Sequence, residues 1–261
     1  MTNAVSPAAL QPALPAQESP TAIPGIIGAA EANQYAADWL ALIERADAAE
    51  LCHSLRAVDG QQVAFVSFPV QHIVELVSAG GVQHIEAKFL LKPDSAGQPR
   101  VTLGLFATDT KQHRVSSVYL ANEYSTAVTA PAPALTAQPK TGPASHNEVA
   151  NVLVNHWLQG WATNAATPAM FATPYGTLRG YSFEVGDFLS PLFQLTSFGQ
   201  EEVRIHFVLH RYHATNGAGQ EAPAQTLGLA VQVWSPTALS LGDLIWDMSR
   251  PCPPFSDPIG F

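Results

Sequence analysis

Hydrophobic and polar residues alternate in two similar stretches of the chain, as they do in β-strands with one buried face. In Ile85–Lys92 every second residue is hydrophobic, and Val203–His210 has the same pattern. The sequence TLGL then follows at Thr102–Leu105 and again at Thr226–Leu229, after polar loops that contain glycine. Such loops connect the strands of hairpins. The pattern therefore predicts two strand–loop–strand hairpins, one in each half of the chain.

Hydrophobic residues recur at helical spacing ahead of each hairpin. One helix is predicted for Glu31–Ile43 and another for Val149–Trp161. Each carries a stripe in which large side chains recur every four residues: Tyr35, Trp39 and Ile43 in the first, and Leu153, Trp157 and Trp161 in the second. Between helix and hairpin, each half has a short strand, SFPV at Ser67–Val70 or SFEV at Ser182–Val185, and a shorter helix.

The four matches follow the same order in both halves, which favours duplication over chance. The helices align Trp39 with Trp157, and the strands align Ile85 with Val203; both pairs are 118 residues apart (157 − 39 and 203 − 85). We therefore predict an α+β fold made of two tandem copies of an α-β-α-β-β unit. Each copy has a small, mainly antiparallel sheet with helices packed on one face, and a pseudo-twofold axis relates the copies as in a fused dimer.

Two segments rich in alanine and proline divide the chain. Residues 1–28 are predicted to be a disordered tail, and residues 127–145 a linker. The first repeat then covers residues 29–126. The second covers 146–261 and ends in a proline-rich segment.

Composition narrows the functional classes. Hydrophobic residues make up 47% of the chain, which is enough for a core, and charged residues only 13%. The net charge of −9 argues against nucleic acid as a partner. The sequence shows neither a secretory signal nor an apolar stretch of bilayer length, so we expect a cytoplasmic protein without a membrane span. Its two cysteines, Cys52 and Cys252, cannot form a disulfide framework.

Histidines in the second hairpin are the first candidates for chemistry. His206 and His210 share one face of their strand, where the first copy has Lys88 and Lys92. We expect a solvated strand face in both copies and no metal, because a third ligand is not evident. No nucleotide-binding, hydrolase-elbow or zinc motif is found, so no cofactor and no catalytic residue is predicted.

Glycines in the TLGL strands mark the second candidate. Gly104 and Gly228 interrupt their strands at matching places, next to Phe106 and Trp234. A glycine in a strand leaves a hollow that a large side chain of the same unit or a ligand can fill. The candidate binding residues are therefore His206, His210, Trp234, Gly104, Gly228 and Phe106.

Two functional hypotheses follow. The preferred one is a non-enzymatic interaction or assembly module that binds a protein partner or itself through open sheet faces. The alternative is a small-ligand-binding or hydrolase-like enzyme. Its site would lie in the groove between the repeats and would use His206, His210 and Asp187.

The second half also resembles a family of small bacterial proteins. The resemblance covers Tyr181–Ser256 and rests on SFEV, TLGLAV and the terminal DLIWDMSRPCPPF. In that family a single unit ends in a Cys-Pro-Pro-x-Cys tail, whereas Ser256 here replaces the last cysteine. The resemblance implies a small α+β unit, here present twice. It implies no activity.

Overall fold

The structure is a computed structural model and describes residues 25–57, 60–122, 151–173, 176–193, 195, 201–215, 221–234, 245–246 and 250–251. The first half contains β1 (Ile26–Ile27), α1 (Ala29–Glu44), α2 (Ala48–Ser54), β2 (Phe65–Pro69), α3 (Val70–Val77), β3 (His84–Pro93), β4 (Pro99–Thr108) and β5 (Val118–Leu120). The second half contains α4 (Asn151–Thr163), η2 (Pro168–Phe171), β6 (Ala172–Thr173), β7 (Gly176–Thr177), β8 (Gly180–Glu184), α5 (Val185–Leu192), β9 (Glu202–Thr215), β10 (Glu221–Trp234), β11 (Ile245–Trp246) and β12 (Arg250–Pro251).

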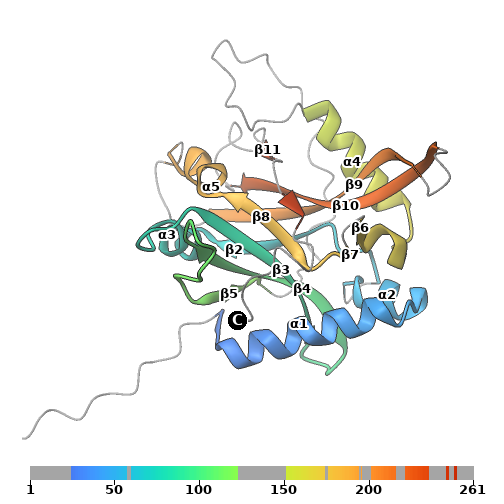
Figure 1. The fold of residues 1–261 in the computed structure, drawn as a ribbon, viewed down its shortest axis with the longest axis horizontal. Coiled ribbons are helices and arrows are strands. Elements are labelled where there is room, and N and C mark those ends of the chain that lie inside the picture. Colours follow the sequence, from blue (N-terminus) through green and yellow to red (C-terminus); the bar gives the residue numbers. More distant parts are fainter. Residues whose placement is uncertain are drawn as a thin grey trace, which may run out of the picture.

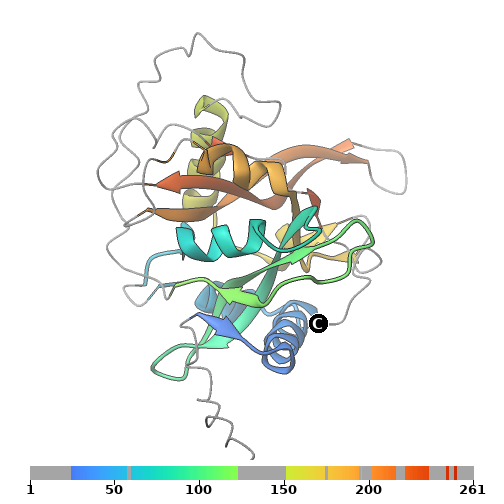
Figure 2. The same ribbon diagram turned by 90° about the vertical axis from the view of Figure 1, so that its left-hand side faces the viewer.

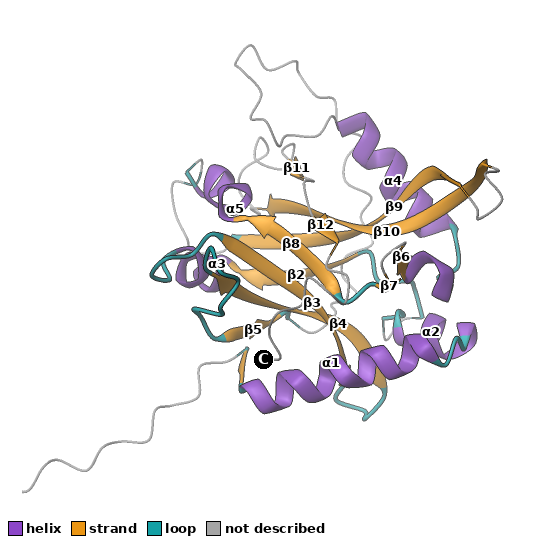
Figure 3. Cartoon of the chain, in the orientation of Figure 1, coloured by secondary structure: helices purple, strands orange, loops and turns teal. Residues whose placement is uncertain are grey.

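The strands form two main antiparallel sheets (Figures 1 and 3). One has six strands in the order β1-β5-β4-β3-β8-β12, and the other has four in the order β11-β10-β9-β2. A third, two-stranded sheet joins β6 and β7. The β9–β10 hairpin is the longest element pair, and one end of it extends beyond the neighbouring elements in Figure 1. Both predicted hairpins and both long helices are present.

Each main sheet contains strands from both halves of the chain. Strand β8 of the second half pairs with β3 of the first, which places Phe183 opposite Ile85. Strand β2 of the first half pairs with β9 of the second, which places Phe68 opposite Val203. The two pairings are reciprocal, because Phe68 and Phe183 occupy the same place in the SFPV and SFEV segments. The halves are therefore interlocked by strand exchange.

The main hydrophobic core of the described residues lies between the sheets. Alternate residues of both hairpins point into it, together with buried side chains of α3 and α5. In Figure 2, α3 lies between the two hairpins and α5 overlaps the β9–β10 hairpin in projection. Phe89 of β3 and Phe207 of β9 stack on each other in this core, with ring centroids 6.5 Å apart. The core is thus shared by the two halves.

Two buried tryptophans fix the long helices to the opposite half. The indole Nε1 of Trp39 in α1 donates to the carbonyl of Leu178 at 3.2 Å, and that of Trp161 in α4 donates to Val63 at 2.8 Å. Trp39 also packs on Phe89, as Trp161 does on Phe207. These matching contacts make Trp161 the counterpart of Trp39. The sequence alignment of Trp39 with Trp157 is therefore wrong by one helical turn.

The α+β class is confirmed, with mainly antiparallel sheets. Helices α3 and α5 bury their hydrophobic side in the shared core, whereas α1 and α4 also contribute to small clusters on the outer sheet faces. The tandem duplication and the two-repeat division stay predictions, although the reciprocal pairing agrees with them. Within the described ranges, no helix combines the length and the apolar character that a bilayer crossing requires.

Candidate functional site

The candidate residues of the second half lie on the outer face of the four-stranded sheet, the face turned away from the shared core. Side chains alternate along β9 and β10, so His206, His210 and Trp234 all belong to this face. Helix α4 covers one end of it, where Val154 packs against Val208 and Ala230. The other end, around Trp234, is only partly buried.

His206 is the most perturbed group on this face. Its side chain is 9% exposed, and its ring lies 5.0 Å from that of Phe65. Its Nε2 lies 2.8 Å from Oε1 of Gln232, so a neutral imidazole donates to this amide oxygen. Burial lowers the pKa of His206 to about 4, and the nearby Arg204 charge adds to that effect.

The prediction of a solvated face is wrong for Lys88 and His206, which are buried, whereas Lys92 and His210 are partly exposed. Lys88 occupies in β3 the position that His206 occupies in β9, and it is only 7% exposed. Its Nζ lies 5.6 Å from the ring centroid of Phe106, which is also buried. The alternation correctly assigned these side chains to one face, but it could not indicate what covers that face.

The two glycines are buried and serve packing. A Cβ at Gly104 would lie 2.8 Å from Cδ1 of Leu90, and a Cβ at Gly228 would overlap the ring of His210. His210 is wedged between Gly228 and Trp157, whose ring centroid is 4.4 Å from its own. Burial lowers the pKa of His210 as well. The hollows are thus filled by side chains of the protein, and the expected open docking faces at Gly104, Gly228 and Phe106 are wrong.

The two glycines also lie opposite different positions of their partner strands. Gly104 lies opposite Lys88, whereas the counterpart of Lys88, His206, lies opposite Ala230. Gly228 instead lies opposite Val208. Relative to its partner strand, TLGL in the second hairpin is therefore shifted by two residues from its place in the first hairpin. A shift of two residues keeps the glycine on the same face of the sheet but places it opposite a different residue.

The partly exposed end of the face carries a guanidinium held between two aromatic rings. The Cζ of Arg204 lies 3.8 Å from the ring centroid of Trp234 and 4.6 Å from that of Phe65. Its Nε lies 3.5 Å from a carboxylate oxygen of Glu202. We call Phe65, Arg204 and Trp234 the cation–aromatic patch. Sequence reasoning found only Trp234, although strand alternation places Arg204 on the same face as His206.

Asp187, the proposed carboxylate of an enzyme site, has a structural role. It lies in the first turn of α5 and accepts a hydrogen bond from the backbone N–H of Glu184 at 3.0 Å, as part of a capping box. Helix α5 packs into the shared core, whereas His206 points to the opposite side of its sheet and contacts an amide. Within the described residues, no group of three or more His, Cys, Asp or Glu side chains is suited to a metal ion.

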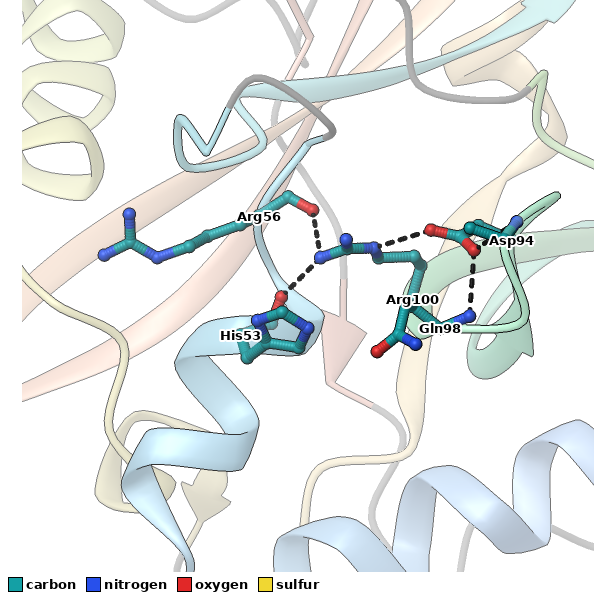
Figure 4. Close-up of polar contacts among 6 residues, drawn as sticks. His53, Arg56, Asp94, Gln98 and Arg100 are labelled. Carbon is teal, nitrogen blue, oxygen red and sulfur yellow. Dashed lines mark hydrogen bonds and ion pairs between the residues drawn. The ribbon is translucent and has the colours of Figure 1, made fainter.

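A second polar cluster joins the first hairpin to α2 (Figure 4). Arg100 donates to the carbonyls of His53 and Arg56 at 2.8 and 2.9 Å, at the end of that helix, and pairs with Asp94 at 3.1 Å. A hydrogen bond from the Gln98 backbone, assisted by the Arg100 side chain, lowers the pKa of Asp94. Every contact is internal, so the cluster stabilises the hairpin loop.

An open groove of about 620 Å³ lies beside this hairpin, between it and α1. Its lining residues all come from the first half of the chain: Asp38, Ala41, Glu44, Arg45, Leu91, Pro93, Gly97 and Pro99. It is therefore distinct from the inter-repeat groove of the enzyme hypothesis.

Several predictions fall outside the described residues. They concern Cys252, Ser256, residues 1–24 of the predicted tail and the predicted linker 127–145. Residues 25–28 of that tail are ordered, because Ile26–Ile27 pair with β5 and Gly28 is the N-cap residue of α1, so the tail was predicted too long. Comparison of the chain with protein-family models, with curated proteins and with solved structures gives no match. The function must therefore be argued from the site alone.

Proposed function

We propose that this protein is a non-enzymatic interaction or assembly module, which binds a protein partner or a second copy of itself through the cation–aromatic patch. The sequence predicted open sheet faces as the interface. We now propose one part of one face, the end of the outer face that α4 leaves partly exposed. The predicted compartment remains the cytoplasm. A nucleic-acid partner is disfavoured by the sequence prediction alone.

One observation carries the proposal: Arg204 lies between Trp234 and Phe65 on the outer face of the four-stranded sheet. Tryptophan and arginine are the residues most often found at the energetic centres of protein interfaces. Their side chains here are ordered by contact with each other, so binding would cost less conformational entropy than it does for free side chains. All three belong to paired strands, which hold them in fixed relative positions.

The chemistry of the neighbouring groups agrees with binding rather than catalysis. Among the described residues of this face, His206 is the strongly perturbed base, and it is neutral near pH 7 and hydrogen-bonded to an amide. A general base would need a reacting proton within reach and a pKa near the working pH. The buried His206–Gln232 pair instead supports the strand that presents Arg204.

The test measures association in two ways with the same variants. The full chain is analysed by light scattering over a range of concentrations, and is used as bait after chemical crosslinking in the native host. Trp234→Ala should weaken whichever association is found, while its unfolding transition stays cooperative. Phe193→Ala is the matched control, because Phe193 is 83% exposed and lies outside the patch.

Two results would contradict the proposal. One is a chain that stays monomeric at high concentration and captures no protein. The other is an association that Phe193→Ala weakens and Trp234→Ala leaves unchanged. Either result would place the functional surface elsewhere.

A further inference from the structure

The guanidinium of Arg204 is held in a way that exposes only part of its hydrogen-bonding capacity to water. The aromatic rings of Trp234 and Phe65, on the two strands beside β9, both contact the group. Its side chain is 18% exposed. A planar guanidinium presents its N–H groups as a fork that fits a carboxylate in a bidentate fashion. A ligand that accepts hydrogen bonds would therefore meet the N–H edge of the group.

Few of those N–H groups have an acceptor. Within the described parts of the chain, its hydrogen-bond acceptor is Oε2 of Glu202, which lies 3.5 Å from Nε. That distance is at the long limit for a hydrogen bond. Burial lowers the pKa of Arg204, and Glu202 only partly opposes this. A charged group that is largely desolvated and weakly paired gains from an incoming acceptor.

We infer that Arg204 anchors a single carboxylate from an acidic side chain of the bound protein segment, with Trp234 and Phe65 receiving the apolar residues beside it. This inference rests on the proposed function and names the chemistry of its partner. The net charge of −9 and the adjacent Glu202 disfavour ligands with several negative charges, such as phosphate groups. One carboxylate at contact distance suffers least from that repulsion.

The test uses two short capped peptides as probes, acetyl-Leu-Glu-Leu-amide and acetyl-Leu-Gln-Leu-amide. Each is titrated into the full chain while the NMR signals of the Trp234 indole N–H and the Arg204 Nε–H are followed. The glutamate peptide should shift both signals along a saturable curve. The glutamine peptide should bind at least about ten-fold more weakly, because a neutral amide cannot form the charge-assisted pair.

Two arginine variants provide the specificity control. Arg204→Lys keeps the charge but loses the planar fork, and should reduce affinity for the glutamate peptide about ten-fold. Arg211→Lys changes an exposed arginine on the same strand and should leave it unchanged. Circular dichroism at rising temperature checks that both variants fold. Equal binding of the two peptides, or unchanged affinity in Arg204→Lys, would overturn the inference. Displacement of the glutamate peptide by an equal concentration of inorganic phosphate would also overturn it.

The failure of this inference is distinguishable from failure of the proposed function. If Trp234→Ala abolishes association but Arg204→Lys retains it fully, the patch is an interface without a carboxylate anchor. If Trp234→Ala retains association, the proposed interface itself is wrong, whatever the peptides do.

Discussion

Protonation of His206 should make the stability of this protein depend on pH. The folded protein holds the imidazole neutral, with a pKa of about 4, whereas the unfolded chain has the ordinary value near 6.5. Between these two values the unfolded state binds more protons than the folded state. Stability contributed by neutral His206 is therefore fully present above pH 6.5, and is lost as the pH falls toward 4.

The size of the effect follows from the difference between the two pKa values. A difference of about 2.5 units at roughly 1.4 kcal/mol per unit gives about 3 kcal/mol in full. Between pH 8 and pH 5 the expected loss of unfolding free energy is about 2 kcal/mol. His210 titrates in the same direction, because burial also lowers its pKa. The measurement must therefore isolate His206.

The assay is urea unfolding of the wild type and of His206→Gln at pH 8 and pH 5. Glutamine does not titrate, and its amide N–H can still donate to Gln232. We expect the pH-dependent loss of stability to be smaller in His206→Gln by about 2 kcal/mol. His213→Gln is the control for the substitution itself, because His213 is an exposed histidine of the same strand. An equal loss in the wild type and His206→Gln would refute the buried, neutral imidazole.

Two further predictions concern the interlocked halves. Trp39→Phe and Trp161→Phe each leave a buried carbonyl without its indole donor. Each variant should reduce the free energy of unfolding in urea by about 1–2 kcal/mol. A loss in one variant alone would contradict equivalent roles for the two tryptophans. Gly180→Ala places a Cβ against the backbone carbonyl of Ala87 and should destabilise by about 3 kcal/mol or more in thermal unfolding. Gly186→Ala, in α5 with open space around it, should be neutral or slightly stabilising; similar effects of the two glycine variants would show that the β3–β8 contact is not tight.

Local periodicity was sufficient to predict the elements but not their partners. Alternation in Ile85–Lys92 and the stripe through Trp39 gave the correct strand and helix. The exchange of β2 and β8 between the halves depends on strand pairs that are 92 to 141 residues apart, from Lys88–Gly180 to Phe65–His206, and no local pattern encodes such pairs. The helix alignment failed because Trp157 and Trp161 are one turn apart, so either matches Trp39 in sequence. The hydrogen bond from Trp161 and its packing on Phe207 show that Trp161 has the contacts that match those of Trp39.

The candidate site was predicted in part. Strand parity correctly grouped His206, His210 and Trp234 on one face, because parity is a local property of the backbone. Exposure was predicted wrongly, since α4 lies over Val208 and Ala230 in a way that the strand sequence does not reveal. Arg204 was not predicted, because a single cation on a strand face is common and the strand sequence does not show that two rings contact it.

Site-specific photocrosslinking tests the central claim most directly. A photoreactive benzoylphenylalanine replaces Ser67, which lies opposite Arg204 on the neighbouring strand, so that the cation–aromatic patch itself stays intact. The same probe is placed at Leu153 and Phe193, two exposed hydrophobic positions outside the patch. The account predicts crosslinks to a protein partner or to a second copy from position 67, and their loss when Trp234→Ala is added. Crosslinks from position 153 or 193 alone, with none from position 67, would contradict it.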